Sequence, residues 1–473
     1  MKKTLVTILL MCAACNMFAQ SFKIDVAIKG LENSMVTLAI HGGATKYAVD
    51  SIMLDNNGKG TFVKKEGVEG GMYFLVSKGM ALFDFLVSGD NNDDFGITAN
   101  VNDYSKIQFT NSPENTAMLA YIDFRNQHQE SYQNLMQKMT EAADNADEQN
   151  RLRAELLGFN NPLINFSDSL ANKYKGKVLA TVVNALKPMI EPDFNLPEDE
   201  PDRNFKIAMN YYLFNKEHFF DNTDFSDERI LRTPFFEPNI FDYYFQNVLI
   251  FKEPDSIIPC IDKTLSLAKE GSRVYRYLLS HLFNYYYKSA VMGHEEIVIH
   301  LAENYYLSNK ITMEDEKFYK DLAEFVLRNK PTLIGQTSPN LILPTADGKR
   351  YESIHGLTAN YIVLYFFDPD CGHCKTDTPL IKNTYDKYKD VLGLEVYAVN
   401  VHNDQKKWVD FIDTMKLDWI NVWDPNRSAD IHNLFNTYTT PQIYILDKDK
   451  KVLARRLDAE NLDKVLEYYA GNK

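Results

Sequence analysis

The pattern of apolar and polar residues changes character along the chain, and each change marks a predicted region. Between residues 20 and 112 apolar and polar residues alternate, as in the run 22–28, and turn-forming residues such as 55–60 separate the runs. Alternation with a period of two is typical of half-buried strands. Short strands separated by turns predict an antiparallel, sandwich-like β domain over 20–112.

Between residues 113 and 330 the apolar positions have a helical period instead. Ser112 and Pro113 predict the first helix start, because serine caps helices and proline is favoured at the first helical position. Further on, apolar residues recur at three- and four-residue spacing and would form one helix face. These residues are Tyr275, Leu278, Leu279, Leu282 and Tyr286. We therefore predict a central α-helical domain over 113–330.

From residue 331 to 473 strand and helix patterns alternate, which predicts an α/β domain with a parallel or mixed sheet. The segment 361–367 is apolar throughout, as expected of a central strand that is buried on both faces. The chain as a whole is therefore predicted to be multidomain, with an N-terminal antiparallel β domain, a central α-helical domain and a C-terminal α/β domain.

The first 19 residues have the features of a secretory signal peptide. Lys2 and Lys3 precede an apolar stretch at 4–15, and Ala19 supplies a small residue at the predicted cleavage site. The apolar stretch would make about 18 Å of helix, which is too short to span about 30 Å of hydrocarbon. Cys15 lies in a stretch similar to a lipoprotein box, so lipidation there is the alternative to cleavage after Ala19. In both cases we expect a protein of the periplasm or cell envelope, attached to the membrane only if Cys15 is lipidated.

Composition and charge exclude some classes of function. The 473 residues are 45% hydrophobic and 25% charged, which is typical of globular proteins. The net charge of −14 argues against nucleic acid as a partner, since binding of phosphates needs clustered positive charge. His294 and His300 are six residues apart and would lie on different faces of a helix, so they do not form a zinc-binding pair. We predict no metal site and no cofactor.

Beyond the leader the cysteines are Cys260 and a Cys-Gly-His-Cys pair at 371–374. The pair lies between the buried strand and a helix predicted over 375–390, where unpaired N–H groups can lower a thiol pKa from about 8.5 to roughly 3.5–7.5. A protonated His373 would favour the thiolate further. One pair cannot complete a four-cysteine zinc site, and a bridge over so short a loop adds little stability. The pattern therefore favours a redox-active pair.

This pair in this setting resembles the active site of the thioredoxin superfamily, and residues 334–473 are similar to its TlpA-like and AhpC/TSA-like branch. The segments 335–339 and 347–349 resemble the strand and turn that open that branch. Pro379 matches the proline within the active-site helix, and Thr440-Pro441 matches a loop whose proline is cis and lies beside the cysteines. The resemblance implies a C-terminal α/β thioredoxin fold for residues 331–473.

The resemblance also implies a role for each site residue. Cys371 would be the exposed nucleophile and Cys374 the resolving thiol. The backbone at Thr440, before Pro441, would pair with an extended substrate peptide. Asp377 aligns with an acidic residue that serves in proton transfer, and the alternative is an ordinary first-turn carboxylate. Tyr365 stands where thioredoxins have a buried acid, so the proton of the second thiol is left to Asp377, water or Tyr365.

The expected function is that of a periplasmic thiol–disulfide oxidoreductase. Its partners would be client proteins bearing thiols or disulfides, and an unidentified thiol electron donor or acceptor. The Gly-His between the cysteines resembles protein disulfide isomerase, which favours a potential nearer about −180 mV than −270 mV and leaves the direction of exchange open. One alternative is a redox-sensing or partner-binding protein with a non-catalytic thioredoxin domain. A thiol peroxidase is less favoured, because Asp368 stands where related peroxidases have threonine.

Overall fold

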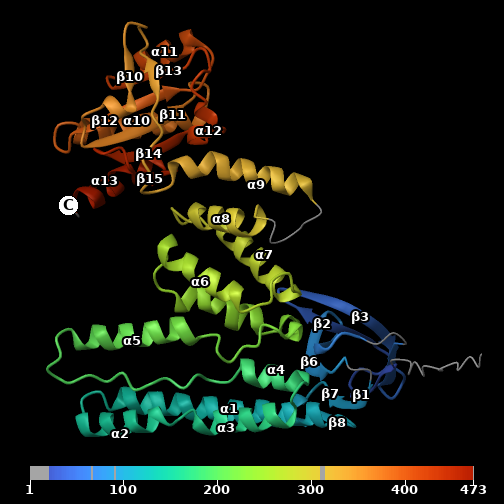
Figure 1. The fold of residues 1–473 in the computed structure, drawn as a ribbon. Helices are drawn as coiled ribbons and strands as arrows, with labels where there is room; N and C mark the ends of the chain where they lie inside the picture. The colour runs from blue at the N-terminus through green and yellow to red at the C-terminus, as the bar shows by residue number, and fades with distance from the viewer. Residues whose placement is uncertain (1–20, 65–67, 90–91, 309–314, 472–473) are drawn as a thin grey trace, which may run out of the picture. The chain divides into compact units, whose positions relative to one another are not determined.

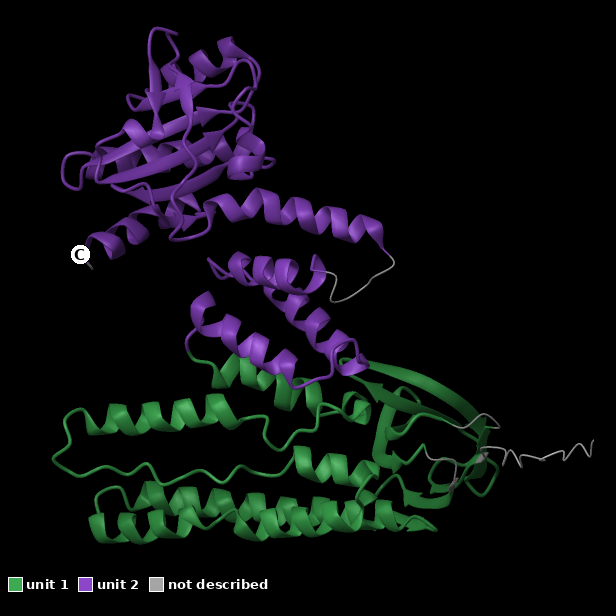
Figure 2. Ribbon diagram, viewed as in Figure 1, with its two compact units in different colours: residues 1–250 green, residues 251–473 purple. Residues whose placement is uncertain are grey.

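A computed structural model describes residues 21–471 except for 65–67, 90–91 and 309–314 (Figure 1). The predicted signal peptide at 1–19 lies outside the described residues. The chain divides into two compact units, residues 1–250 and 251–473 (Figure 2). This division differs from the predicted domain boundaries near 112 and 330, which stay predictions. Among the described residues, no helix has the length and apolar character that a membrane crossing requires.

The first unit begins with two four-stranded sheets, in the strand orders β4-β1-β7-β8 and β3-β2-β5-β6. One apolar core unites the inner faces of both sheets, with Phe22 and Ile24 from the first and Leu38 and Leu75 from the second. The strands are β1 (Ser21–Lys29), β2 (Met35–Gly42), β3 (Thr45–Met53), β4 (Lys59–Lys64), β5 (Gly71–Ser77), β6 (Met80–Val87), β7 (Asn92–Asn100) and β8 (Gln108–Thr110). This confirms the predicted sandwich-like β domain.

One strand pair departs from the predicted antiparallel pattern. β1 and β7 pair in parallel, whereas the other strand pairs that the described residues form in these two sheets are antiparallel. Alternation along a strand predicts which side chains face the core, but it carries no information about the direction of a partner that lies far along the chain. The direction of this pair is therefore a finding of the structure.

Helices follow in the rest of the first unit, as predicted, and a segment at 186–202 between them is not helical. Ser112 caps the first helix, because its Oγ accepts a hydrogen bond from the Asn115 backbone N–H at 3.4 Å, and Pro113 occupies the first helical position. The helices are α1 (Pro113–Glu141), α2 (Ala146–Leu157), α3 (Asn161–Lys173), α4 (Val178–Ala185) and α5 (Arg203–His218). A short 3₁₀ helix follows, η2 (Glu228–Arg232), and after it come two short π-helices, η3 (Phe236–Phe241) and η4 (Tyr244–Val248).

The second unit opens with more helices. The predicted apolar face is present on α7, where all five residues named above are buried. The elements are α6 (Pro254–Ser266), α7 (Arg273–Tyr287), α8 (Glu295–Leu301), η5 (Ala302–Tyr306), α9 (Glu316–Asn329) and η6 (Lys330–Thr332).

A mixed five-stranded sheet in the order β13-β12-β11-β14-β15 forms the centre of the C-terminal domain. The central strand β11 pairs in parallel with β12 and antiparallel with β14, and all seven of its residues are buried. Val363 and Tyr365 enter the core on one face, and Leu364 and Phe366 enter the core on the other. This confirms the prediction of a central strand buried on both sides.

The elements of this domain run in alternating order. Its strands are β9 (Ile342–Pro344), β10 (Tyr351–Ser353), β11 (Tyr361–Phe367), β12 (Leu394–Asn400), β13 (Ile420–Trp423), β14 (Gln442–Asp447) and β15 (Val452–Arg455). Its helices are α10 (Gly372–Tyr388), α11 (Gln405–Met415), α12 (Ile431–Phe435) and α13 (Leu462–Gly471). α10, α11 and α13 cover one face of the sheet and α12 contributes to the other.

Arg455, on the edge strand β15, joins the sheet to the helices that precede it. Its side chain is 1% exposed. Its guanidinium donates to the Asn329 carbonyl at 2.9 Å, to the Asn329 Oδ1 at 2.8 Å and to the Thr332 carbonyl at 3.3 Å. The end of α9 is therefore fixed to the sheet by buried hydrogen bonds.

We expect Arg455→Ala to lower the free energy of unfolding of this domain by about 3 kcal/mol, because it leaves a cavity and buried carbonyls without their donor. All three tryptophans lie in this domain, so tryptophan fluorescence during urea unfolding measures the change. The matched control is Arg456→Ala. Arg456 is itself exposed, although its partner Glu295 at 3.1 Å is mostly buried, so its loss should lower the free energy of unfolding clearly less than the loss of Arg455. Equal losses in the two variants would contradict the prediction.

Candidate active site

The two cysteines lie at the carboxyl end of β11, where a tight turn converts the strand into helix α10. The Asp368 carboxylate accepts a hydrogen bond from the Asp370 N–H at 2.7 Å, and the Asp368 carbonyl accepts one from the Cys371 N–H at 3.0 Å. The helix begins at Gly372, three residues earlier than predicted, because this turn already sets the chain on a helical path. Cys371 is thus the N-cap, and Cys374 lies in the first turn.

Cys371 is the accessible thiol of the pair. Its side chain is partly exposed, and its Sγ lies 3.4 Å from the carbonyl oxygen of Thr440. Partial burial opposes ionisation, but hydrogen bonds from the Cys374 backbone N–H and the Thr440 side chain outweigh it and lower the pKa of Cys371. A lowered pKa raises the thiolate fraction, and the thiolate is the nucleophilic form.

Cys374 has the opposite environment. It is 0% exposed, and burial raises the pKa of its thiol to about 12, although the Asp368 backbone N–H acts against the shift. Behind it, the Thr378 hydroxyl donates to the Cys374 carbonyl at 2.7 Å and lies 2.8 Å from the Tyr365 hydroxyl. Burial also raises the pKa of Tyr365. The phenol therefore stays protonated at neutral pH and cannot accept a proton from Cys374.

Asp377 lies three residues after Cys374, so both side chains project from neighbouring positions on α10. Its carboxyl group is partly buried, and burial raises its pKa, although His373 works in the other direction. The exposed Asp458 raises the pKa further. A carboxylate with a raised pKa is a stronger proton acceptor once it is ionised.

The remaining predicted residues lie on the neighbouring loop and at the helix start. The Thr440–Pro441 peptide bond is cis, the geometry that the resemblance implies. Thr440 contacts the Cys371 sulfur, whereas His373 is exposed on the first turn of α10. The structure thus brings Cys371, Cys374 and Thr440 together, and the roles assigned to these residues stay predictions.

A second group of polar residues beside Cys371 was not predicted. Potential ligand atoms of Asp368, Asp370 and His402 lie within 4.8 Å of one another. The Asp370 carboxylate is 2.6 Å from the Lys407 ammonium and 3.3 Å from His402, and the hydrogen bond with Lys407 lowers the pKa of Asp370. Lys407 already supplies a cation here, so we assign no metal. His402 and Lys407 carry no motif and are more than 30 residues from Cys371, so no sequence signal identified them.

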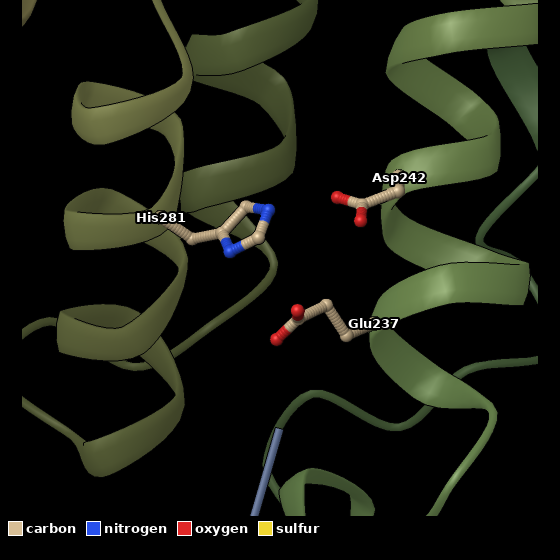
Figure 3. Close-up of side chains that lie close together, drawn as sticks. All are labelled: Glu237, Asp242 and His281. Carbon is tan, nitrogen blue, oxygen red and sulfur yellow. The ribbon is translucent and has the colours of Figure 1, made fainter. Parts of the chain in front are cut away.

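A third polar group is drawn in Figure 3. Glu237 projects from η3, and Asp242 directly follows that element in the first unit. His281 projects from α7, which belongs to the second unit. We therefore assign these three side chains to no common site.

Comparison with known families decides the class of the C-terminal domain. Residues 359–452 match the model of a family described as thioredoxin-like. The C-terminal domain belongs to the thioredoxin-like family. Residues 182–329, in the helical region before the thioredoxin-like domain, match a domain family of unknown function. The comparison with curated proteins found no match.

Solved structures of bacterial proteins are similar to parts of the chain. A domain of a possible thiol-disulfide isomerase from Cytophaga hutchinsonii is 34% identical over 30% of this chain and 97% of its own, with a TM-score of 0.29. The thioredoxin domain of a thiol-disulfide oxidoreductase from Bacteroides vulgatus is 23% identical over 29% of this chain and 96% of its own, with a TM-score of 0.27. A thioredoxin-like protein from Bacteroides caccae is 19% identical over 60% of this chain and 97% of its own, with a TM-score of 0.46. These scores are low, so the assignment rests on the family model.

Proposed function

We propose that the protein is a thiol–disulfide oxidoreductase whose Cys371–Cys374 pair exchanges disulfides with client proteins. The observation that carries this proposal is the contrast between the two thiols. Cys371 is accessible and has a lowered pKa, whereas Cys374 is buried and has a raised pKa. An accessible thiolate suits attack on an incoming disulfide, and a protonated second thiol in the adjacent helical turn suits a resolving role.

In the reducing direction the Cys371 thiolate attacks one sulfur of a client disulfide. A Cys371–client disulfide forms, and the other client sulfur leaves with the electron pair of the broken bond and takes up a proton. Cys374 then loses its proton and attacks the Cys371 sulfur, which releases the second client thiolate. The client gains two electrons and two protons, the thioredoxin-like domain becomes the disulfide, and an external dithiol must reduce it again. Oxidation of a client is the same sequence in reverse.

The location belongs to the same proposal. The predicted signal peptide supports a protein of the periplasm or cell envelope, where disulfides persist, with Cys15 lipidation as the route to membrane attachment. The reduction potential of the pair against glutathione would settle the direction. A value near about −270 mV or below supports a reductase, and one between about −180 and −120 mV supports an oxidase or isomerase.

Trapping of mixed disulfides tests the proposal. We expect Cys374→Ser to accumulate client proteins on Cys371, because the resolving thiol is gone while the nucleophile remains. Non-reducing electrophoresis of the full-length protein, isolated from cells that secrete it, should show many adducts that a dithiol removes. The double variant with Cys371→Ser should show none.

Other outcomes would favour the alternative functions. A single fixed adduct would support a redox-sensing or partner-binding protein. Absence of adducts combined with rapid consumption of peroxide by the purified protein would support a thiol peroxidase.

A further inference from the structure

Tyr438 is an exposed aromatic residue that is nevertheless held from three sides. The Arg328 guanidinium lies over its ring, with Cζ 3.9 Å from the ring centroid. The Tyr438 hydroxyl donates to the Asn433 Oδ1 at 3.0 Å, and the His432 ring lies 5.3 Å away. Even so, Tyr438 is 53% exposed. A side chain that is already fixed loses little conformational entropy when a ligand binds to it, which is the property of an aromatic anchor.

Helix α9 holds both this ring and the loop that carries it. The Arg328 Nη2 donates to Glu324 at 2.7 Å, whereas its Nε is buried and has no hydrogen-bond partner among the described residues. The guanidinium is therefore placed by its stacking on Tyr438 and by one ion pair within α9. Asn329, the next residue, accepts a hydrogen bond from the Asn436 side chain at 3.2 Å. The region before the thioredoxin-like domain thus contacts the loop at two successive residues.

The position of Tyr438 relates it to the reactive thiol. It lies two residues before Thr440, whose carbonyl oxygen is 3.4 Å from the Cys371 sulfur. Two residues of extended chain span at most about 7 Å. The Tyr438 backbone therefore lies within about 7 Å of the Thr440 backbone, which faces the thiol that a client cysteine would bond to.

The surroundings of the ring favour an apolar partner over a charged one. Glu324 neutralises Arg328, so the pair presents little net charge next to the ring. A second aromatic ring that packs against Tyr438 would gain roughly two- to tenfold in affinity beyond the apolar area it buries. We propose that Tyr438 is a specificity-determining residue that favours clients with an aromatic side chain near the reactive cysteine, and that Arg328 is its positioning residue. This inference rests on the proposed oxidoreductase function.

Two synthetic peptides test the inference. Each has one cysteine joined through a disulfide to thionitrobenzoate, and they differ only in carrying phenylalanine or glycine two residues to either side of that cysteine. The full-length Cys374→Ser protein is used, so that only the first exchange occurs. The Cys371 thiolate forms a disulfide with the peptide sulfur, and the coloured thionitrobenzoate leaves with the electron pair. Glutathione joined to thionitrobenzoate serves as the small reference substrate.

We expect the Phe peptide to react roughly two- to tenfold faster than the Gly peptide. Tyr438→Ala should bring the ratio of the Phe-peptide rate to the Gly-peptide rate to about one. It should leave unchanged the rates with the Gly peptide and with the glutathione–thionitrobenzoate disulfide. Arg328→Ala should lower the ratio in part, and Tyr438→Phe should largely preserve it because the ring remains.

Tyr351→Ala is the matched control. Tyr351 is 70% exposed on β10, and the neighbouring Glu352 lines a pocket with Glu395 and Ile420 at the amino ends of β12 and β13, the edge of the sheet opposite to the cysteines. This variant should keep the full preference for the Phe peptide.

Three results would overturn the inference. The first is a preference for the Phe peptide that survives Tyr438→Ala. The second is an equal fall with all three substrates, which would mean that Tyr438 only supports the loop. The third is the absence of any thionitrobenzoate release from the Cys374→Ser protein, in which case the oxidoreductase function itself fails and the recognition role falls with it.

Discussion

Cys371→Ser should reduce disulfide exchange to the rate of the buffer alone. Exchange begins with attack by a thiolate, and the environment of Cys371 lowers its pKa through hydrogen bonds from the Cys374 backbone and Thr440 that outweigh partial burial. A serine hydroxyl remains protonated at neutral pH and cannot form the mixed disulfide. The measurement is the rate at which the reduced full-length protein releases thiol from a protein disulfide such as insulin, with a dithiol present to recycle the enzyme.

Cys260→Ser is the matched control for this prediction. Cys260 is buried in α6, and its thiol donates a hydrogen bond to the Ser256 carbonyl at 3.3 Å, a contact that a serine hydroxyl can replace. Its rate of exchange should equal that of the wild type. Substantial exchange by Cys371→Ser, or a large loss in Cys260→Ser, would mean that the reactive thiol has been misassigned.

The features predicted correctly from the sequence are those encoded by neighbouring residues. The apolar run 361–367 predicts a strand buried on both faces, and β11 has these bounds. Ser112 and Pro113 predict the start of α1, because capping depends on residues within one helical turn. The Cys-Gly-His-Cys sequence likewise predicts two cysteines at the junction of a strand and a helix, and they lie after β11, where α10 begins. Their redox role stays a prediction.

The features that were not predicted depend on residues far apart in the chain. Arg455 binds Asn329 across more than 120 residues, and Arg328 stacks on Tyr438 across more than 100. Neither pair has a motif or a period that marks it, since each residue alone is an ordinary polar residue of a helix, strand or loop. The parallel pairing of β1 with β7 could not be predicted from the sequence for the same reason.

The sequence alone does not identify the group that accepts the Cys374 proton. The pKa shifts at the site now exclude one of the candidates. Three acceptors for the Cys374 proton were expected, namely Asp377, water and Tyr365. Burial raises the pKa of Tyr365, so its phenol is already protonated and is no acceptor at neutral pH. Asp377 and water remain, and a single substitution separates them.

We expect Asp377→Asn to slow resolution of the mixed disulfide by roughly a hundredfold at neutral pH, the effect of losing a general base. Burial raises the pKa of Cys374, so little of its thiol is ionised at pH 7 and its attack needs a proton acceptor. The measurement mixes reduced protein with glutathione disulfide and follows decay of the Cys371–glutathione adduct by acid quench. Alkylation of Cys371 by iodoacetamide should change little, because that step does not use the base.

The pH profile distinguishes a base from a merely structural carboxylate. Burial raises the pKa of Asp377, and Asp377 accepts protons only when ionised, so the wild-type rate of resolution should fall as the pH drops through that raised pKa. Asp458→Asn removes a charge that helps to raise this pKa and should move the fall to lower pH. The rate of resolution in Asp377→Asn should show no fall at the pKa of Asp377. It should instead rise steadily with pH as the Cys374 thiol ionises by itself.

The matched control for the carboxylate is Asp386→Asn, also on α10, where Asp386 pairs with Lys382 at 2.5 Å. Its pH profile should follow that of the wild type, because this ion pair lies more than two helical turns beyond Cys374. If Asp377→Asn gave the same profile as Asp386→Asn, the proton would pass from Cys374 directly to water. Asp377 would then be an ordinary carboxylate of the first helical turns, stabilised there by the helix dipole.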